Sequence, residues 1–300
     1  MQVHLIGTGA VGSLYGGLLA RSGAALTVQC RSDFVEVQRD GIRIESHVGL
    51  GNWVFRPDQV IRAGEPLVKP PDIVILAIKL TPRCDRVALL SPVIGPKTVI
   101  VSISNGLEVE NELADSFPDN EILGGVAFVC ATRINPGYVV HQAYGHLVLG
   151  RYPSGPSLAG EALVNRWLST GASAEYSLQL ETVRWQKALW NASFSALCTI
   201  SHTHTASVLG SAEELVRQVM TEIHETATRL GHELPNGIIE KQINGTHRMP
   251  PYLPSMSLDQ RAGDPTEKEV IVGNAVRAAR RAGVKTPHLD TLYTLLKLQE

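Results

Sequence analysis

The sequence of 300 residues contains few cysteines, no excess of charge and no long apolar run. Its four cysteines are widely spaced and form no C-x-x-C pair, so they indicate neither a zinc site nor a disulfide framework. No run of about 18 apolar residues occurs, so no membrane span is predicted. A formal net charge of -2 provides no general attraction to nucleic acid. We therefore expect no nucleic-acid or membrane partner, and ordinary buried thiols at Cys30, Cys84, Cys130 and Cys198.

The amino terminus lacks the pattern of a secretory signal. Its first apolar stretch ends at Gly7, which is too short and too early for the apolar region of a signal peptide. We therefore expect a cytoplasmic protein. With 44% hydrophobic residues the chain can bury a large core, and its length predicts two domains of about 100–200 residues each.

The first half of the sequence shows alternating strand and helix patterns. Apolar runs at 3–6 and 26–30 flank a helical stretch at 12–22, which predicts a βαβ unit. Further runs at 73–78 and 98–103 have no polar alternation, as is typical of parallel strands buried on both faces. The glycine-rich, alternating segment 122–150 predicts antiparallel strands that finish the edge of the sheet, and a helix is expected at 161–169.

The second half has helical periodicity at 182–196, 212–230 and 266–282, and strand-like runs disappear. Between the last two helices, the proline-rich stretch 249–254 cannot continue a helix and predicts a loop. The predicted fold class is α/β. A Rossmann-type doubly wound sheet is expected at 1–178 and an all-helical domain at 179–300.

A G-x-G-x-x-G motif follows the first predicted strand and opens the first predicted helix. In such motifs the first glycine permits a tight turn, the second lets the backbone approach a pyrophosphate, and the third allows close helix packing. The helix N-terminus attracts phosphate. The alternative is a glycine turn selected only for tightness. We predict that a dinucleotide binds at Gly7, Thr8, Gly9, Ala10, Val11 and Gly12.

The residue at the end of the second strand points to NADP(H). NAD sites usually carry an Asp or Glu there, whereas this chain has Arg31, whose guanidinium can pair with a 2′-phosphate. Lys79 follows the third predicted strand and is expected to approach the same phosphate or the adenine, although a solvated lysine fits equally well. Asp33 and Glu36 lie close to Arg31 in the sequence and could bind a ribose instead.

A candidate proton donor lies in the first helix of the second domain. Lys187 and Asn191 are one turn apart on a largely apolar helix, and partial desolvation lowers the pKa of a lysine enough to make it a workable acid. A metal is not expected. His202 and His204 have no third ligand at a suitable spacing, and Thr228 stands where H-E-x-x-H would need its second histidine.

The order of these motifs resembles the ketopantoate reductase family over nearly the whole chain. The resemblance rests on the glycine motif and on five further features, namely Asn105-Gly106, Pro136-Gly137 with His141 and Gly145, Lys187 with Asn191, Ser255-Met256, and Thr266-Glu267. It implies an NADPH-dependent reduction of 2-dehydropantoate to pantoate, a small 2-oxo acid substrate, and a role in pantothenate and coenzyme A biosynthesis.

The resemblance also implies roles for individual residues. Lys187 would be the general acid, and Glu267 would orient it and contact substrate and cofactor. Asn105 would lie near the nicotinamide and the reacting carbonyl, Asn191 would bind a substrate hydroxyl, and Ser255 the carboxylate. Taken singly, three of these residues also suit purely structural roles: Asn105 in a turn before glycine, Ser255 at a helix cap, and Glu267 in the first turn of a helix.

Four positions depart from the family's pattern. Ser195, which we also expect to contact substrate, and Thr205 replace asparagines, while Tyr252 and Pro254 replace an asparagine and a serine. These changes leave open a different 2-oxo acid substrate within the wider 6-phosphogluconate-dehydrogenase-like fold. A catalytically silent NADP-binding sensor is the other alternative. The apolar helices of the second domain also make a homodimer possible.

Overall fold

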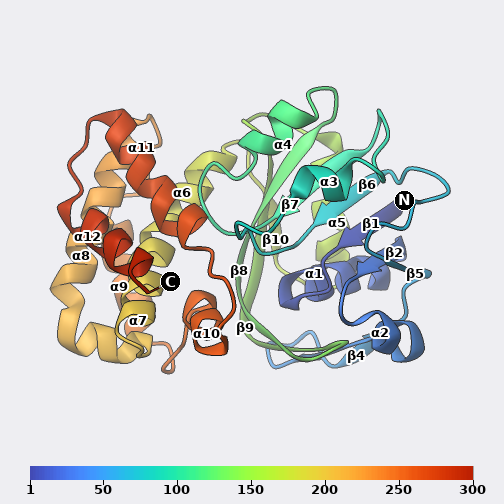
Figure 1. The fold of residues 1–300 in the computed structure, drawn as a ribbon, viewed down its shortest axis with the longest axis horizontal. Coiled ribbons are helices and arrows are strands. Elements are labelled where there is room, and N and C mark those ends of the chain that lie inside the picture. The colour runs from blue at the N-terminus through green and yellow to red at the C-terminus, as the bar shows by residue number, and fades with distance from the viewer. Residues whose placement is uncertain (300) are drawn as a thin grey trace. The chain divides into compact units, whose positions relative to one another are not determined.

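The computed structural model describes residues 1–299, and the chain divides into two compact units (Figure 1). The sheet unit comprises Met1–Ser104 and Glu110–Leu180, and the helical unit comprises Asn105–Val109 and the chain from Glu181 onward. The division after Leu180 lies close to the predicted boundary at 178. The prediction did not foresee that 105–109 belongs with the helices.

The sheet unit contains a ten-stranded sheet in the order β4-β3-β9-β8-β7-β6-β1-β2-β5, with β10 paired to β9. The strands β5, β2, β1, β6, β7 and β8 are parallel to their neighbours in this order. The strands are β1 (Gln2–Ile6), β2 (Ala25–Cys30), β3 (Ile42–Ser46), β4 (Trp53–Phe55), β5 (Gln59–Arg62), β6 (Ile73–Leu76), β7 (Val99–Ile103), β8 (Ile122–Asn135), β9 (Tyr138–Arg151) and β10 (Ala174–Tyr176).

Helices cover both faces of the parallel strands. On one face α1 and α5 pack in a core with Leu5, Leu14 and Trp167, whereas α3 and α4 pack on the other face with Ile6 and Val74. Neighbouring strand residues thus enter different cores, which explains the continuous apolar runs, and each such side chain stabilises the fold by roughly 1.5–3 kcal/mol. The helices are α1 (Ala10–Arg21), α2 (Phe34–Asp40), α3 (Arg86–Leu90), α4 (Asn111–Ser116) and α5 (Leu158–Ser169).

The predicted antiparallel pair at 122–150 is confirmed as β8 and β9, but the prediction that it finishes the sheet edge is wrong. Each strand has 14 residues, so β9 extends far enough to pair in parallel with β3. A hydrogen bond of 3.1 Å between Ser46 Oγ and the buried His141 Nδ1 links these two strands. The strand β3 was not predicted, because its alternating pattern extends over only five residues.

The helical unit confirms the predicted class of the second domain. The expected helix at 212–230 corresponds to the part of α8 after a kink at Ala212, and residues 250–254 form the expected irregular loop. The periodicity did not indicate α9, α10 or α12. The elements of the helical unit are α6 (Leu180–Trp190), the π-helical turn η1 (Asn191–Ser195), α7 (Ala196–Ile200), α8 (Thr205–Arg229), α9 (Ile238–His247), α10 (Ser255–Ala262), the π-helical turn η2 (Glu269–Gly273), α11 (Asn274–Ala282) and α12 (Pro287–Lys297).

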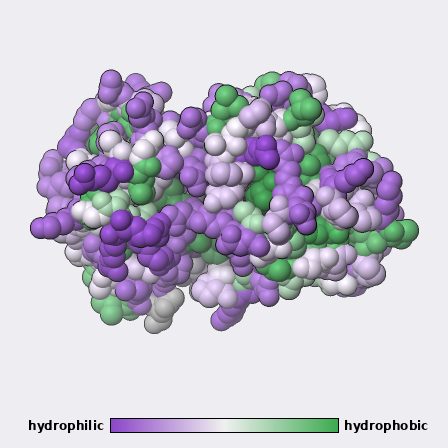
Figure 2. Space-filling view, turned by 90° about the horizontal axis from the view of Figure 1, so that it is seen from above, coloured by the Kyte–Doolittle hydropathy of each residue, from purple (hydrophilic) through white to green (hydrophobic). Residues whose placement is uncertain are grey.

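The surface mixes residue types. Figure 2 shows a face on which hydrophilic residues predominate and hydrophobic ones form small scattered patches. Among residues 1–299, no helix combines the length and the apolar character that crossing a bilayer requires.

Candidate functional site

The glycine motif forms the turn between β1 and α1, and its three glycines have different surroundings. Gly7 has φ +104°, and a Cβ on either Gly7 or Gly12 would overlap a backbone carbonyl oxygen, that of Ala77 or of Gly7 respectively. A Cβ on Gly9 would have no described atom within 4 Å. Gly7 and Gly12 are therefore required by the fold, whereas Gly9 leaves open space at the start of the helix.

The N-terminus of α1 suits an anion. Gly9 is its N-cap residue, no described side chain caps the helix, and its first turn carries no acidic residue. The first N–H groups of a helix lack partners within the helix, and its dipole places partial positive charge there. The open side of Gly9 and this helix end together can hold a phosphate group.

Two cations follow the strands on either side of β1. Arg31 directly follows β2 and Lys79 follows β6 by three residues, and both side chains are exposed. Asp33, by contrast, is only 1% exposed, and its Oδ2 lies 3.6 Å from a guanidinium nitrogen of Arg133. Burial, followed by the charge of Asp33, raises the pKa of the Cys30 thiol to about 12. The exposed group at this strand end is thus the arginine and not the nearby aspartate.

In the helical unit, three polar side chains from distant segments form a hydrogen-bonded chain. Lys187 Nζ donates to Asn105 Oδ1 at 2.7 Å, and Asn105 Nδ2 donates to Glu267 Oε2 at 3.1 Å. Lys187 is half-buried and Glu267 is 5% exposed. Because both outer groups are charged, these are charge-assisted hydrogen bonds, which are stronger than neutral ones. The asparagine amide therefore links an ammonium to a buried carboxylate.

Asn105 joins the helical unit because the segment after β7 is anchored to η2. Gly106 has φ +102°, and a Cβ there would come within 2.6 Å of the Val270 carbonyl oxygen. The backbone of Leu107 donates to that oxygen at 3.1 Å, and Asn274 Nδ2 donates to the Leu107 carbonyl at 2.6 Å. Sequence reasoning missed Asn274, since its partner lies 167 residues away and no local pattern marks the contact.

Two family models match the chain. The model described as ketopantoate reductase PanE/ApbA covers residues 3–154, and its C-terminal companion covers residues 179–300. The chain belongs to the ketopantoate reductase family. Members of this family are oxidoreductases, and the chain is therefore an oxidoreductase. The resemblance noted in the sequence is confirmed.

Relatives of known name agree with this assignment. The chain is 32% identical to a 2-dehydropantoate 2-reductase from Nostoc sp., over 98% of this chain and 93% of the relative. The crystal structure of a 2-dehydropantoate 2-reductase from Methylococcus capsulatus is 45% identical and superposes with a TM-score of 0.94, covering 99% of this chain and 96% of that one. One from Geobacter metallireducens is 29% identical, with a TM-score of 0.93 and full coverage of both chains.

The other residues that the ketopantoate reductase resemblance points to lie in the helical unit. Asn191 is half-buried and begins η1, so the expected regular helix at 182–196 changes there to a wider π-helical turn, a feature frequent at functional sites. Ser195 ends that turn and is 4% exposed. Ser255 is the first residue of α10 and is exposed. The glycine motif, Arg31 and Lys79 all belong to the sheet unit.

Of the two histidines at 202 and 204, the second has a structural role in this ketopantoate reductase family member. His204 is the N-cap of α8, and its Nδ1 accepts a hydrogen bond from the Ser207 backbone N–H at 3.2 Å. Within residues 1–299, no three His, Cys, Asp or Glu side chains are grouped in a way that could hold a metal ion.

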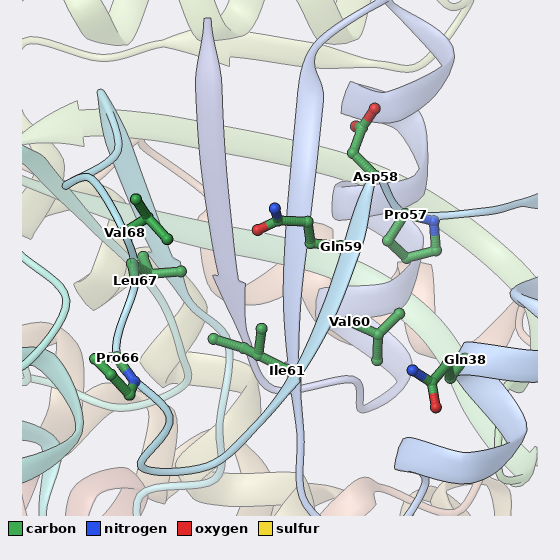
Figure 3. A pocket seen from close by; sticks show the side chains of 9 residues that line it. All are labelled: Gln38, Pro57, Asp58, Gln59, Val60, Ile61, Pro66, Leu67 and Val68. Carbon is green, nitrogen blue, oxygen red and sulfur yellow. The ribbon is translucent and has the colours of Figure 1, made fainter.

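A pocket beside the edge strand β5 has no predicted site residue in its lining (Figure 3). Its one acid, Asp58, is used structurally, because its Oδ2 accepts from the Leu26 backbone N–H at 2.7 Å. This pocket therefore provides no acidic group that is available for carbonyl reduction. It is lined by Gln38, Pro57, Asp58, Gln59, Val60, Ile61, Pro66, Leu67 and Val68.

Proposed function

We propose that this chain is an NADPH-dependent 2-oxo acid reductase whose substrate is 2-dehydropantoate and whose product is pantoate. The observation that supports it most directly is the hydrogen-bonded chain from Lys187 through Asn105 to Glu267. Carbonyl reduction needs a group that can give a proton to the developing alkoxide, and an ammonium held in a fixed position provides one.

The residues proposed for the pyrophosphate and the 2′-phosphate of the cofactor lie in the sheet unit. The backbone at Gly7, Gly9 and Gly12 and the N-terminus of α1 would bind the pyrophosphate, with Arg31 and Lys79 on the adenosine 2′-phosphate. The open space at Gly9 fits this group. When bound, NADPH supplies the hydride that adds to the substrate's C2 carbon.

The helical unit supplies the acid in this proposal. Lys187 Nζ gives a proton to the C2 oxygen, which becomes the product hydroxyl, and the lysine is left as a neutral amine. Glu267, acting through Asn105, orients the ammonium and stabilises its charge before that step. Asn191, Ser195 and Ser255 would bind the substrate's polar groups.

A silent NADP-binding sensor is the weaker candidate. Glu267 is 5% exposed, and withdrawing a carboxylate from water costs stability unless other interactions or a function compensate. The decisive experiment is to follow NADPH oxidation by absorbance with ketopantoate and a panel of other 2-oxo acids. We expect turnover with ketopantoate. NADPH binding without accelerated oxidation by any 2-oxo acid would overturn the proposed function.

Charge reversal at Arg31 tests the cofactor part of the proposal. Arg31→Asp should lower kcat/KM for NADPH by roughly 10–100-fold, because a charge-assisted pair with the 2′-phosphate contributes about 1.5–3 kcal/mol. The value for NADH should not fall, since NADH lacks that phosphate. Arg43→Asp, an exposed arginine on β3, is the matched control. An equal fall in kcat/KM for NADPH and for NADH would show that Arg31 does not bind the 2′-phosphate.

Assembly and location complete the proposal. A homodimer is proposed, and a dimeric ketopantoate reductase from Staphylococcus aureus has the same fold, with 19% identity and a TM-score of 0.80. The cytoplasmic location stays a prediction.

A further inference from the structure

Leu107 anchors the segment 105–109 to the helical unit. Its backbone N–H donates to the Val270 carbonyl at 3.1 Å, and its carbonyl accepts from Asn274 Nδ2 at 2.6 Å. Its side chain is 2% exposed and packs in the core of the helical unit. Both polar backbone groups and the side chain of Leu107 are therefore fixed, two residues after Asn105.

The orientation of the Asn274 amide follows from its two partners. Arg277 donates to Asn274 Oδ1 from Nη2 at 2.6 Å and from Nε at 3.2 Å. A guanidinium can only donate hydrogen bonds, and a backbone carbonyl can only accept them. The amide is therefore held at both ends, with its oxygen toward Arg277 and its nitrogen toward Leu107.

The backbone on either side of Leu107 has positive φ angles. Gly106 has φ +102°, and Glu108 has φ 56°, a left-handed conformation that a non-glycine residue rarely adopts. Such a residue persists only where the surrounding contacts hold it. The Glu108 carboxylate forms an ion pair with Arg281 of α11, the helix that begins at Asn274. The turn at 106–108 therefore depends on α11 for its shape.

Asn105 is the residue whose position this turn sets. Its amide pairs with two charged groups at once, Lys187 Nζ at 2.7 Å and Glu267 Oε2 at 3.1 Å. Hydrogen bonds weaken steeply when they are bent, so a shift of the Asn105 backbone would weaken both. The Gly106 carbonyl accepts from Arg184 Nη1 at 3.2 Å, and Arg184 lies three residues before Lys187 on α6. The turn is thus also tied to the helix that carries the proposed acid.

We infer that Asn274 is a positioning residue of the reaction, which holds the Leu107 carbonyl and thereby keeps Asn105 where it orients the ammonium of Lys187. Asn274 acts on the acid only through the backbone at 105–107. The inference rests on the proposed function, because its effect is measured on the reduction in which Lys187 gives the proton.

The test measures kcat for ketopantoate reduction with NADPH in Asn274→Asp. This isosteric change keeps an acceptor for Arg277 but turns a carboxylate oxygen toward the Leu107 carbonyl, which it cannot bond when ionised. We expect kcat to fall by about tenfold or more, because a misplacement of about 1 Å can cost about 10²-fold. The Kd for NADPH should not change, since the residues proposed for its phosphates lie in the sheet unit. Asn244→Asp, at an exposed asparagine of α9, is the matched control and should keep the wild-type kcat.

A second background separates positioning from a general structural role. Asn105→Ala should itself lower kcat, and adding Asn274→Asp to it should cause no further loss, because the effects of residues that act through one another are not additive. The same fold-loss in both backgrounds would overturn the inference, since the change would then act independently of Asn105. A folded Asn274→Asp enzyme with the wild-type kcat would overturn it as well.

Thermal unfolding shows whether the variants are folded at the assay temperature. If Asn274→Asp is not, Asn274→Ala removes the same donor without adding a charge, and its kcat must fall in the wild-type background and not in Asn105→Ala. These outcomes decide the inference alone. No oxidation of NADPH by the wild type with ketopantoate or any other 2-oxo acid overturns the proposed function itself.

Discussion

Replacing Lys187 with alanine is expected to lower kcat for 2-oxo acid reduction by about 10²–10⁴-fold, the usual contribution of a positioned general acid. The variant keeps Asn105 and Glu267 but has no ammonium to give a proton to the alkoxide. The Kd for NADPH should stay close to the wild-type value, because the glycine motif, Arg31 and Lys79 belong to the sheet unit. Steady-state kinetics with ketopantoate and a binding titration with NADPH measure the two effects separately.

Two further variants show whether the loss comes from chemistry. Lys187→Arg keeps the positive charge but replaces the donor with a guanidinium, which does not give up a proton in proteins, so kcat should remain low. Lys241→Ala removes an exposed lysine from α9 and should leave kcat unchanged. A Lys187→Ala enzyme with kcat within about threefold of the wild type would exclude Lys187 as the acid, since a lost general acid costs far more.

The structural features that the sequence predicts best are those set by residues close together in the sequence. The β1-α1-β2 unit could be recognised because its apolar runs and glycine turn lie within the first 30 residues. The strand β3 could not, because its place is set by pairing with β9, and Ser46 and His141 are 95 residues apart. Long-range pairing overrides local pattern wherever a strand is short and only half-buried.

The hydrogen-bonded group of candidate catalytic residues shows the same limit of prediction from local sequence. Asn105 lies 82 residues before Lys187 and 162 residues before Glu267, so no local spacing could bring the three together. The family resemblance pointed to all three residues. It did not predict that Asn105 lies between the two charged groups and is hydrogen-bonded to both. Anchoring of 105–109 on the helical unit, which makes this contact possible, depends on partners such as Val270 that carry no chemical signal.

The structure bears on two points that the sequence left open, one through burial and one through a hydrogen bond. The sequence allowed either Arg31 to bind the 2′-phosphate or Asp33 and Glu36 to bind a ribose, and the structure exposes Arg31, buries Asp33 and leaves Glu36 half-buried. It also showed that Tyr252 and Thr205 depart from the family pattern, but not that the two are hydrogen-bonded to each other.

Alanine at Gly12 is expected to destabilise the fold, whereas alanine at Gly9 is expected to weaken cofactor binding and leave the fold unaffected. In Gly12→Ala the new methyl group would overlap the Gly7 carbonyl oxygen, so the free energy of unfolding should fall by about 1–3 kcal/mol or more. In Gly9→Ala the methyl group meets no described atom, and the backbone at φ -73° and ψ -173° suits any residue. That variant should therefore unfold at the wild-type temperature.

Binding of NADPH should nevertheless be about tenfold weaker or worse in Gly9→Ala, because the methyl group would occupy the space where the backbone approaches the pyrophosphate. Thermal unfolding without ligand and a fluorescence titration with NADPH measure the two effects, and Gly210→Ala, within α8, is the matched glycine control. Neither backbone conformation nor packing requires a glycine at position 9, so a binding defect there would point to a ligand outside the chain. Wild-type affinity in Gly9→Ala would instead make the motif a turn selected for tightness alone.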